Sequence, residues 1–524
     1  MAGIITHKFR LNNAAQVYES LTEAANINTR YYIFLSRAHP WASDVSPPTP
    51  TDSVQESDYN SWRNMLAAKR VTSSDVTHAI SRYNWTSGTV YTAYTHNNSS
   101  LYSSQYYVMT DSYNVYKCID NNNGATSIVK PTSTSTSIFK TSDGYLWKFM
   151  YTINASEVLK FVSTNYIPVK TLTANDGTSQ WSVQQAAVNG SIDFIKLTAN
   201  GTGYLATNGT FAAVTNSTVV TLASHSSGTD DVYNNSVIYI KSGLGAGQLR
   251  RIVNYVGTTK QLTVNGSFTT TPNTSSTYYI GPNVIITGDG SEALAYANVA
   301  LPALASSTTG NAINGIIILN RGTNYSKFSV TISANSSHGS GATANGSIPP
   351  YGGHGSDPVK ELPSYNIILN ARISGTESNT LFVNNDFRVV GLMTNPLLAN
   401  GSQANSATYD MTTKLTVTSK SGTFSADEMV TGGTSGAKAR YVSFANTNAL
   451  GTAGVLSLTG LDGTFSTSET ITGNTSSVTA VVSSINNRDF KDYSGDILYI
   501  ENRIPVSRAS DQTEDIKLII RYWG

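Results

Sequence analysis

Apolar and polar residues alternate along much of this chain, and a period of two predicts β-strands with one buried face. The clearest alternation is in residues 516–522, where every second position is Ile, Leu or Tyr. A shorter apolar run at 497–500 precedes it and is predicted to end at Glu501, before a polar connection. The end of the chain is therefore predicted to be two strands joined by a polar turn.

Two stretches near the N-terminus are predicted to be short helices. Asn13 is predicted to cap a helix that runs to about Ala25, and Ser57 to cap a second one that ends with Lys69 and Arg70. Most of the remaining chain consists of strand-like segments separated by Gly, Asn, Ser and Thr turns. The pattern therefore predicts a mainly β protein.

The middle of the chain contains an internal repeat. Residues 192–204 align with residues 313–325 at a constant offset of 121 positions. Each unit is predicted to finish with a strand and a small-residue tail, at 284–299 and 330–348, and a small β module at 205–283 interrupts the first unit. The coinciding positions are Ile192/Ile313, Gly201/Gly322, Thr202/Thr323 and Tyr204/Tyr325.

A second repeat follows at an offset of 41 positions. GTFSADEMVTG (422–432) aligns with GTFSTSETITG (463–473), so that Glu428 matches Glu469. Each copy combines a strand-like segment with a glycine turn, which predicts two β-hairpin units in tandem.

Length and composition narrow the class of protein. A chain of 524 residues predicts roughly two to four domains, and 39% hydrophobic residues are enough to form their cores. Only 13% of residues are charged and the net charge is +1, which argues against a nucleic-acid partner. The single cysteine, Cys118, excludes a framework of disulfides within the chain.

Neither a membrane segment nor a secretory leader is predicted. No stretch approaches the about 18 apolar residues of a membrane helix, and MAGIITHKFRLNN lacks the apolar core of a signal peptide. We therefore expect synthesis in the cytoplasm and no membrane partner.

Candidate chemistry is sparse. GLGAGQ (243–248) is similar to a phosphate-binding loop, but the next segment is patterned as a strand, whereas such a loop needs a helix there. His338 and His354 lie in glycine-rich sequence, and a metal site using both would need further ligands. We therefore assign no catalytic, cofactor-binding or metal-binding residues, expect no cofactor, and predict that the protein is not an enzyme.

Seven segments, in one order along the chain, resemble the baseplate wedge subunit of T-even-type contractile-tailed phages. The resemblance is closest at the C-terminus and is interrupted in the middle, where the two repeats lie. The segments are YYIFLSRAHPW (31–41), PPTPTDS (47–53), VYKCIDNNNGATS (115–127), DGYLWKFMYTI (143–153), NYIPV (165–169), DFRVVGLMTNPLLANG (386–401) and SGDILYIENRIPVSRASDQTEDIKLIIRY (494–522).

This resemblance implies a fold, a function and partners. The family protein is an all-β homodimer with sandwich-like domains, and it binds neighbouring wedge subunits in a scaffold that rearranges on tail contraction. We therefore expect a β-sandwich-like framework with two short N-terminal helices and inserted β-repeat modules, located in the virion tail baseplate and assembled in the host cytoplasm. The implied role is structural and involves no catalysis.

The interruptions of the resemblance suggest where the domains begin and end. Insertions are tolerated in exposed loops, so the repeats are interpreted as modules added to a framework. The predicted divisions are an N-terminal framework domain (1–175), a β-repeat region (176–385) with the nested insert (205–283), a framework return (386–415), a tandem hairpin insert (416–485) and C-terminal framework strands (486–524).

Six residues are candidates for a subunit interface. Trp and Arg are enriched among interface anchors, so one interpretation of the Arg37–Trp41 loop is a docking loop at a subunit interface. The favoured interpretation is internal, with Trp41 packed on Pro40 or Pro47 and Arg37 paired with Asp44 or Asp52. The charged residues near the C-terminus have the same two interpretations, ion pairs within the chain or contacts with a partner. The six candidates are Arg37, Trp41, Arg503, Arg508, Asp511 and Glu514.

Other classes of function remain open from the sequence. Tyr-rich β modules of low charge suit carbohydrate contacts, so a host-surface binding tail fibre or adhesin is the alternative function. The inserted modules would then contact host glycan while the framework serves the baseplate. A polysaccharide-degrading enzyme is a third class, and it would need a pair of carboxylates that meet only in the fold.

Overall fold

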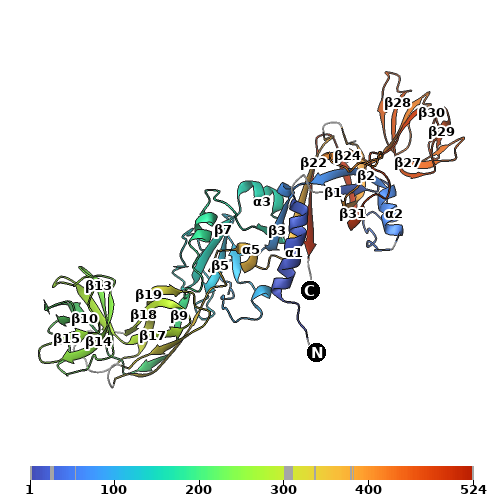
Figure 1. Ribbon diagram of the computed structural model, residues 1–524. Helices are drawn as coiled ribbons and strands as arrows, with labels where there is room; N and C mark the ends of the chain where they lie inside the picture. Colours follow the sequence, from blue (N-terminus) through green and yellow to red (C-terminus); the bar gives the residue numbers. More distant parts are fainter. Residues whose placement is uncertain are drawn as a thin grey trace. The chain divides into compact units, whose positions relative to one another are not determined.

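The structure is a computed structural model that describes residues 3–23, 29–53, 55–299, 311–334, 338–377, 380–381 and 383–521. Strands account for 44% and helices for 10% of the structure, so the prediction of a mainly β, multi-domain fold is confirmed. Two compact units divide the chain, each formed by more than one segment of the sequence (Figure 1). Unit 1 comprises Met1–Ser81, Ala155–Lys170 and Pro363–Gly524, and unit 2 comprises Arg82–Asn154 and Thr171–Leu362.

Unit 1 contains two antiparallel sheets and a closed barrel. The first sheet has the strand order β24-β2-β1-β23-β31, the second has β32-β22-β3-β8, and the barrel runs β25-β28-β27-β26-β29-β30. The strands are β1 (Tyr31–Ser36), β2 (Met65–Val71), β3 (Val76–Ser81), β8 (Tyr166–Val169), β22 (Asn366–Ser374), β23 (Asn385–Thr394), β24 (Thr408–Asp410), β25 (Thr413–Thr418), β26 (Met429–Gly432), β27 (Lys438–Asn446), β28 (Gly454–Asp462), β29 (Thr470–Gly473), β30 (Thr479–Asn486), β31 (Asp496–Arg508) and β32 (Thr513–Arg521).

Strand β1 is buried on both faces. Ile33 and Leu35 belong to a core that also contains Leu518 of the second sheet, whereas Tyr32 and Phe34 belong to a separate aromatic core. A strand covered on both sides needs an almost continuous apolar sequence, which YYIFLS provides. The two sheets of unit 1 therefore pack face to face through one shared core, as in a sandwich.

The two predicted C-terminal strands are present. β32 buries Ile516 and Leu518 in alternation, as predicted, while Tyr522 lies outside the described residues. The predicted end of the first strand at Glu501 is wrong, because β31 continues to Arg508. It passes Pro505 at a register shift against β23, and such a bulge tolerates a residue without a backbone N–H.

The helices differ from their predicted bounds. α1 (His7–Thr22) begins six residues before the predicted cap Asn13, because Thr6 is its N-cap and accepts the backbone N–H of Phe9 at 3.3 Å. The predicted end, Ala25, lies outside the described residues. The other helices are α2 (Glu56–Arg63), α3 (Ala155–Phe161), α4 (Ser179–Gln185) and α5 (Pro358–Glu361).

The second predicted helix was too long. α2 starts at Glu56, so the predicted cap Ser57 is inside the helix, and it ends at Arg63. The predicted helix end, Lys69-Arg70, lies in β2, which pairs with both β1 and β24. Strand pairing on two sides therefore overrides the local helical pattern.

The 41-residue repeat forms one barrel rather than two separate hairpins. Hairpins β26–β27 and β29–β30 are present, but β26 pairs with β29, and β25 and β28 close the barrel. The buried carboxylate of Glu428 accepts the backbone N–H groups of Thr475 and Ser476, both at 2.9 Å. Glu469 accepts the equivalent N–H of Ser435 at 2.9 Å. Each repeat therefore stabilises the loop of the other.

The described residues of unit 2 form four sheets. Their orders are β4-β5-β7-β6, β21-β9, β19-β18-β17-β20, and β10-β16-β13-β14-β15-β12-β11, the last lying within the predicted insert 205–283. The strands are β4 (Tyr107–Met109), β5 (Asn114–Asp120), β6 (Phe139–Lys140), β7 (Leu146–Thr152), β9 (Phe194–Thr202), β10 (Thr207–Thr210), β11 (Ala213–Val214), β12 (Val219–Thr221), β13 (Val237–Ser242), β14 (Leu249–Val256), β15 (Gln261–Val264), β16 (Thr277–Gly281), β17 (Asn283–Gly288), β18 (Ser291–Val299), β19 (Ile313–Thr323), β20 (Phe328–Ile332) and β21 (Ser340–Ser347).

The 121-residue repeat is present, with its tails exchanged. β9 of the first unit pairs with β21 of the second, and β19 of the second pairs with β18 of the first. Gly201 and Gly322 both have positive φ, at 62° and 67°, and a Cβ on either would meet the backbone of the exchanged tail at 2.5 Å. Each glycine therefore makes its close contact with the tail of the other unit, and the two repeat units are interlocked.

Candidate interaction site

Three of the six predicted interface residues lie together in unit 1. Arg37 follows β1 with a left-handed φ of 61°, and its guanidinium lies 3.8 Å from the centre of the Trp41 ring. The Trp41 indole N–H donates to the carbonyl oxygen of Arg503 at 3.0 Å. We call Arg37, Trp41 and Arg503 the Trp41 cluster.

The Trp41 cluster also covers the edge of a sheet. Among the residues that the structure describes, β31 is an outer strand paired only with β23. The bond from Trp41 to Arg503 and a second one, from the Asn502 side-chain amide to the carbonyl oxygen of Pro48 at 2.8 Å, connect the loop to this strand. Covering an exposed edge prevents unwanted strand pairing. The loop that contains Trp41 and Pro48 therefore has a role within the chain, which is to cover the edge strand β31.

Asp44, one of the two acidic partners considered for Arg37, forms its ion pair with Arg388. Asp44 accepts two bonds from the buried guanidinium of Arg388, at 2.9 and 2.8 Å, and one from the Trp41 backbone N–H at 2.8 Å. The hydrogen bonds from Arg388 lower the pKa of Asp44 to about 2. Because its carboxylate is held by Arg388, Asp44 fixes the loop and leaves Arg37 stacked on Trp41.

The other three predicted residues are not in the Trp41 cluster. Arg508 and Glu514 form a buried ion pair, with 3.0 Å between Nε and Oε2, and Arg508 also donates to the carbonyl oxygen of Gly375 at 2.6 Å. Arg508 is 3% and Glu514 8% exposed. The structure therefore contains the first of the two interpretations, an ion pair within the chain. Asp511 is exposed in the turn between β31 and β32.

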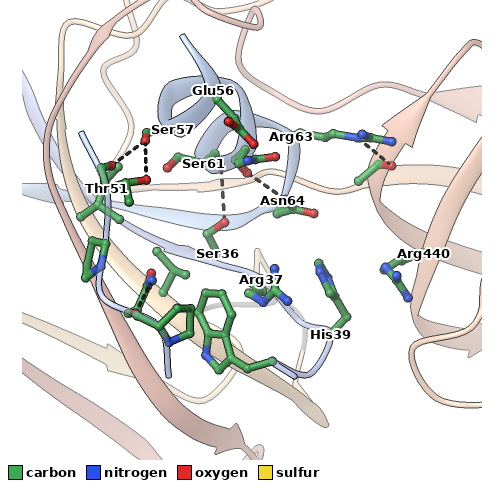
Figure 2. A pocket seen from close by; sticks show the side chains of 18 of the residues that line it. Ser36, Arg37, His39, Thr51, Glu56, Ser57, Ser61, Arg63, Asn64 and Arg440 are labelled. Atoms are coloured by element: carbon green, nitrogen blue, oxygen red, sulfur yellow. Dashed lines mark hydrogen bonds between the residues drawn. The ribbon is translucent and has the colours of Figure 1, made fainter. Parts of the chain in front are cut away.

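A cavity of about 550 Å³ lies beside the Trp41 cluster (Figure 2). Arg37, His39 and Trp41 contribute to it from the loop after β1, Arg63 from α2, and Arg440 from β27 of the barrel. Its lining also includes Ser36, Pro48, Thr49, Pro50, Thr51, Glu56, Ser57, Asn60, Ser61, Asn64, Val389, Met429, Gly460, Ile500 and Asn502.

The field in this cavity is positive. Burial, followed by the charges of Arg37 and Arg440, lowers the pKa of His39 to about 3, so this imidazole is neutral at neutral pH. Burial and the neighbouring Arg388 and Arg440 lower the pKa of Arg37 to about 10. His39, Arg63 and Arg440 could not be grouped from the sequence, because no spacing rule connects a loop, a helix and a barrel strand that meet only in the fold.

A second polar cluster, also missed, is buried in unit 2. Lys117 on β5 contacts Glu361 on α5 at 2.5 Å, and His354 contacts Asp193 at 3.0 Å and Glu361 at 3.8 Å. The His354 ring lies edge-on to Tyr94, with 4.7 Å between the ring centres. We call this the Lys117–Glu361 network. It crosslinks segments distant in sequence and is enclosed rather than open to a ligand.

The N-terminal part of the chain matches a known family. Residues 3–136 match the family model described as Bacteriophage T4, Gp8. The resemblance to a T4-type baseplate wedge subunit is confirmed. The match to Gp8 spans about a quarter of the chain and includes Arg37 and Trp41. No curated protein matches the chain.

The protein that defines the Gp8 family is a structural protein of the phage baseplate. The match therefore supports a structural role in the baseplate and a location in the virion tail. In the described part of the chain, no helix has the length and apolar character needed to cross a membrane. The same residues contain no group of three or more His, Cys, Asp or Glu side chains placed to hold a metal ion.

Proposed function

We propose that this protein is a scaffolding subunit of a phage baseplate wedge, that it forms a homodimer bound to other wedge subunits, and that it takes part in baseplate rearrangement on tail contraction. The observation that carries the proposal is the match of residues 3–136 to the Gp8 family. We further propose that it assembles in the host cytoplasm and acts through its surfaces rather than by catalysis.

The packing inside each of the two units supports a mechanical role. Unit 1 has two cores on opposite faces of one sheet, and unit 2 contains the buried Lys117–Glu361 network. Densely packed subunits of this kind move as bodies and switch between discrete interfaces instead of deforming. A contraction signal would then shift the balance between two arrangements of neighbouring subunits.

The mass of the purified protein in solution tests the homodimer. We expect light scattering coupled to size exclusion to give about 112 kDa, twice the 56.0 kDa of one chain. A stable trimer would contradict the proposal and favour a fibre-like protein. A monomer would mean that dimerisation takes place only during wedge assembly, and co-purification with neighbouring subunits would then be the measurement.

Reversing one exposed charge tests the Trp41 cluster as a contact surface. The Arg503 side chain is 41% exposed and lies 3.6 Å from Glu501 across a weak surface pair, so Arg503→Glu leaves the core intact. We expect this substitution to reduce the yield of assembled particles, with an unchanged thermal unfolding midpoint. The matched control is Lys241→Glu on an exposed position of β13. Equal particle yields from both variants would argue against a contact at Arg503.

A further inference from the structure

The cavity beside the Trp41 cluster carries an excess of positive charge. Arg37, Arg63 and Arg440 line it, and Glu56 is the one acidic side chain among its lining residues in the described part of the chain. In Figure 2, Arg37, His39 and Arg440 lie along one side of the cavity, and Glu56 lies across from them. The chain as a whole has a net charge of only +1, so this excess is local.

Charges around the cavity do not remove this excess. The carboxylate of Asp44 is bound by Arg388, so it is already neutralised. Asp462 lies 3.7 Å from Arg63 but is 66% exposed, and a screened pair of that kind is weak. Arg440 donates to the backbone carbonyl of Asp427 at 3.0 Å, and the Asp427 side chain, whose pKa is raised by burial, offsets the charges of Arg388 and Arg440 only in part.

Two polar atoms of the cavity residues lack a partner. The Nε of Arg37 and the Nδ1 of His39 are both buried, and neither has a hydrogen-bond partner among the described residues. A buried donor without a partner is unfavourable, so such atoms point to a ligand that supplies the missing hydrogen-bond partner. The Nε of a guanidinium only donates, and a neutral imidazole donates from one nitrogen. These atoms suit an oxygen acceptor that carries negative charge.

The volume of the cavity and its apolar lining favour a peptide over a free ion as the ligand. The cavity holds about 550 Å³, whereas one water occupies about 30 Å³ in the liquid, so a single small ion would leave most of it unfilled. Trp41, Pro48 and Pro50 line another part of it, and aromatic and proline surfaces pack against chain segments. Clustered arginines beside such a wall are a known way to recognise acidic peptide motifs.

We propose that this cavity binds an acidic peptide segment of a neighbouring protein, with Arg37, Arg440 and His39 binding a carboxylate and Trp41 packing against the adjacent chain. The site exists only because the inserted barrel brings Arg440 to the framework loop. The proposal rests on the proposed function for the source of the segment, and its chemistry depends only on this cavity.

Calorimetric titration of the full-length protein tests the proposal. The probes are a hexaglutamate peptide, a hexaglutamine peptide and sodium phosphate, compared at one ionic strength. We expect hexaglutamate to bind more tightly than both others, and to bind more weakly as sodium chloride is raised. Arg440→Gln and Arg37→Gln should each weaken its binding by about tenfold or more, since each removes a charge-assisted hydrogen bond.

The control is Arg251→Gln, which neutralises an exposed arginine on β14 of unit 2 and should leave hexaglutamate binding unchanged. An unchanged thermal unfolding midpoint in each variant would establish that the fold is intact. Equal binding of hexaglutamate to all variants, or no binding at all, would overturn the proposal. Binding of phosphate without hexaglutamate, lost in the two cavity variants, would also overturn it and assign a free-oxyanion site instead.

The two proposals fail in different ways. The titration uses only the purified chain, so its failure leaves the wedge assignment standing. Particles that assemble and contract normally without this protein would contradict the wedge assignment, whatever the titration gives.

Discussion

Lys117→Met is expected to lower the free energy of unfolding of unit 2 by about 3–5 kcal/mol, because it leaves the buried carboxylate of Glu361 without its cation. Lys117 is fully buried and Glu361 is 5% exposed. Urea unfolding followed by intrinsic fluorescence measures the effect, as a fall in the midpoint of one transition. Removing both charges with Lys117→Met and Glu361→Leu should recover part of the loss.

The ionised state of Glu361 explains why the expected loss of stability in Lys117→Met is large. Burial alone raises the pKa of Glu361, but Lys117 and His354 outweigh it and hold the pKa at about 2. The backbone N–H groups of Gly355, at 2.7 Å, and Asp357, at 3.2 Å, also donate to it. Since the folded pKa lies below the usual 4.5, this group stabilises the fold fully above pH 4.5, and the contribution is lost as pH falls toward 2.

An exposed ion pair in the same unit provides the control. Lys130 lies 2.8 Å from Asp111, and the two side chains are 38% and 71% exposed. Lys130→Met should therefore change the free energy of unfolding by less than about 1 kcal/mol. If Lys130→Met and Lys117→Met lower the free energy of unfolding equally, burial of the Lys117–Glu361 pair does not increase its contribution to stability.

Glu428→Ala is expected to destabilise the barrel by about 1–3 kcal/mol, because it leaves part-buried backbone N–H groups of the opposite repeat without an acceptor. Glu428 also accepts the hydroxyl of Ser476 at 2.6 Å. The equivalent Glu469→Ala should have a similar effect, since Glu469 accepts the hydroxyl of Ser435 at 2.9 Å. Hydrogen exchange of the barrel amides measures both losses separately from the rest of the chain.

Acid should reproduce this loss in the unsubstituted protein. Burial raises the pKa of Glu428, but the bonds from Ser476 and Thr475 outweigh it, and the pKa of Glu469 is lowered in the same way. Both groups therefore stabilise the barrel fully above the ordinary glutamate pKa and cease to do so as pH falls below it.

Asp462→Asn is the matched control for the barrel. This carboxylate lies at the end of β28 and is 66% exposed, so the substitution should change barrel stability by no more than about 0.5 kcal/mol. Exchange rates that rise as much in Asp462→Asn as in Glu428→Ala would contradict the role given to the buried carboxylates.

Local sequence pattern determined most of the elements and the class of fold. Alternation predicted β32, and the continuous apolar run of β1 matches a strand buried on both faces. The 41-residue and 121-residue repeats are both present in the structure. In each repeat the matching residues make matching contacts, as Glu428 and Glu469 do in the first and Gly201 and Gly322 in the second. Segments resembling a baseplate wedge subunit also pointed to the Gp8 family. These features depend on residues close together in sequence, or on direct comparison of sequence with sequence.

Tertiary structure decided which segments pair and which charges meet. Lys69 and Arg70 carry a helical pattern, yet pairing on two sides places them in β2. The exchanged tails of the 121-residue repeat and the closure of the barrel depend on partners that no local pattern specifies. Asp44 pairs with Arg388, which is 344 positions away, and Arg440 reaches the cavity from the barrel. A local pattern specifies which face of a strand is buried, but only packing of the whole chain selects the neighbour that buries it.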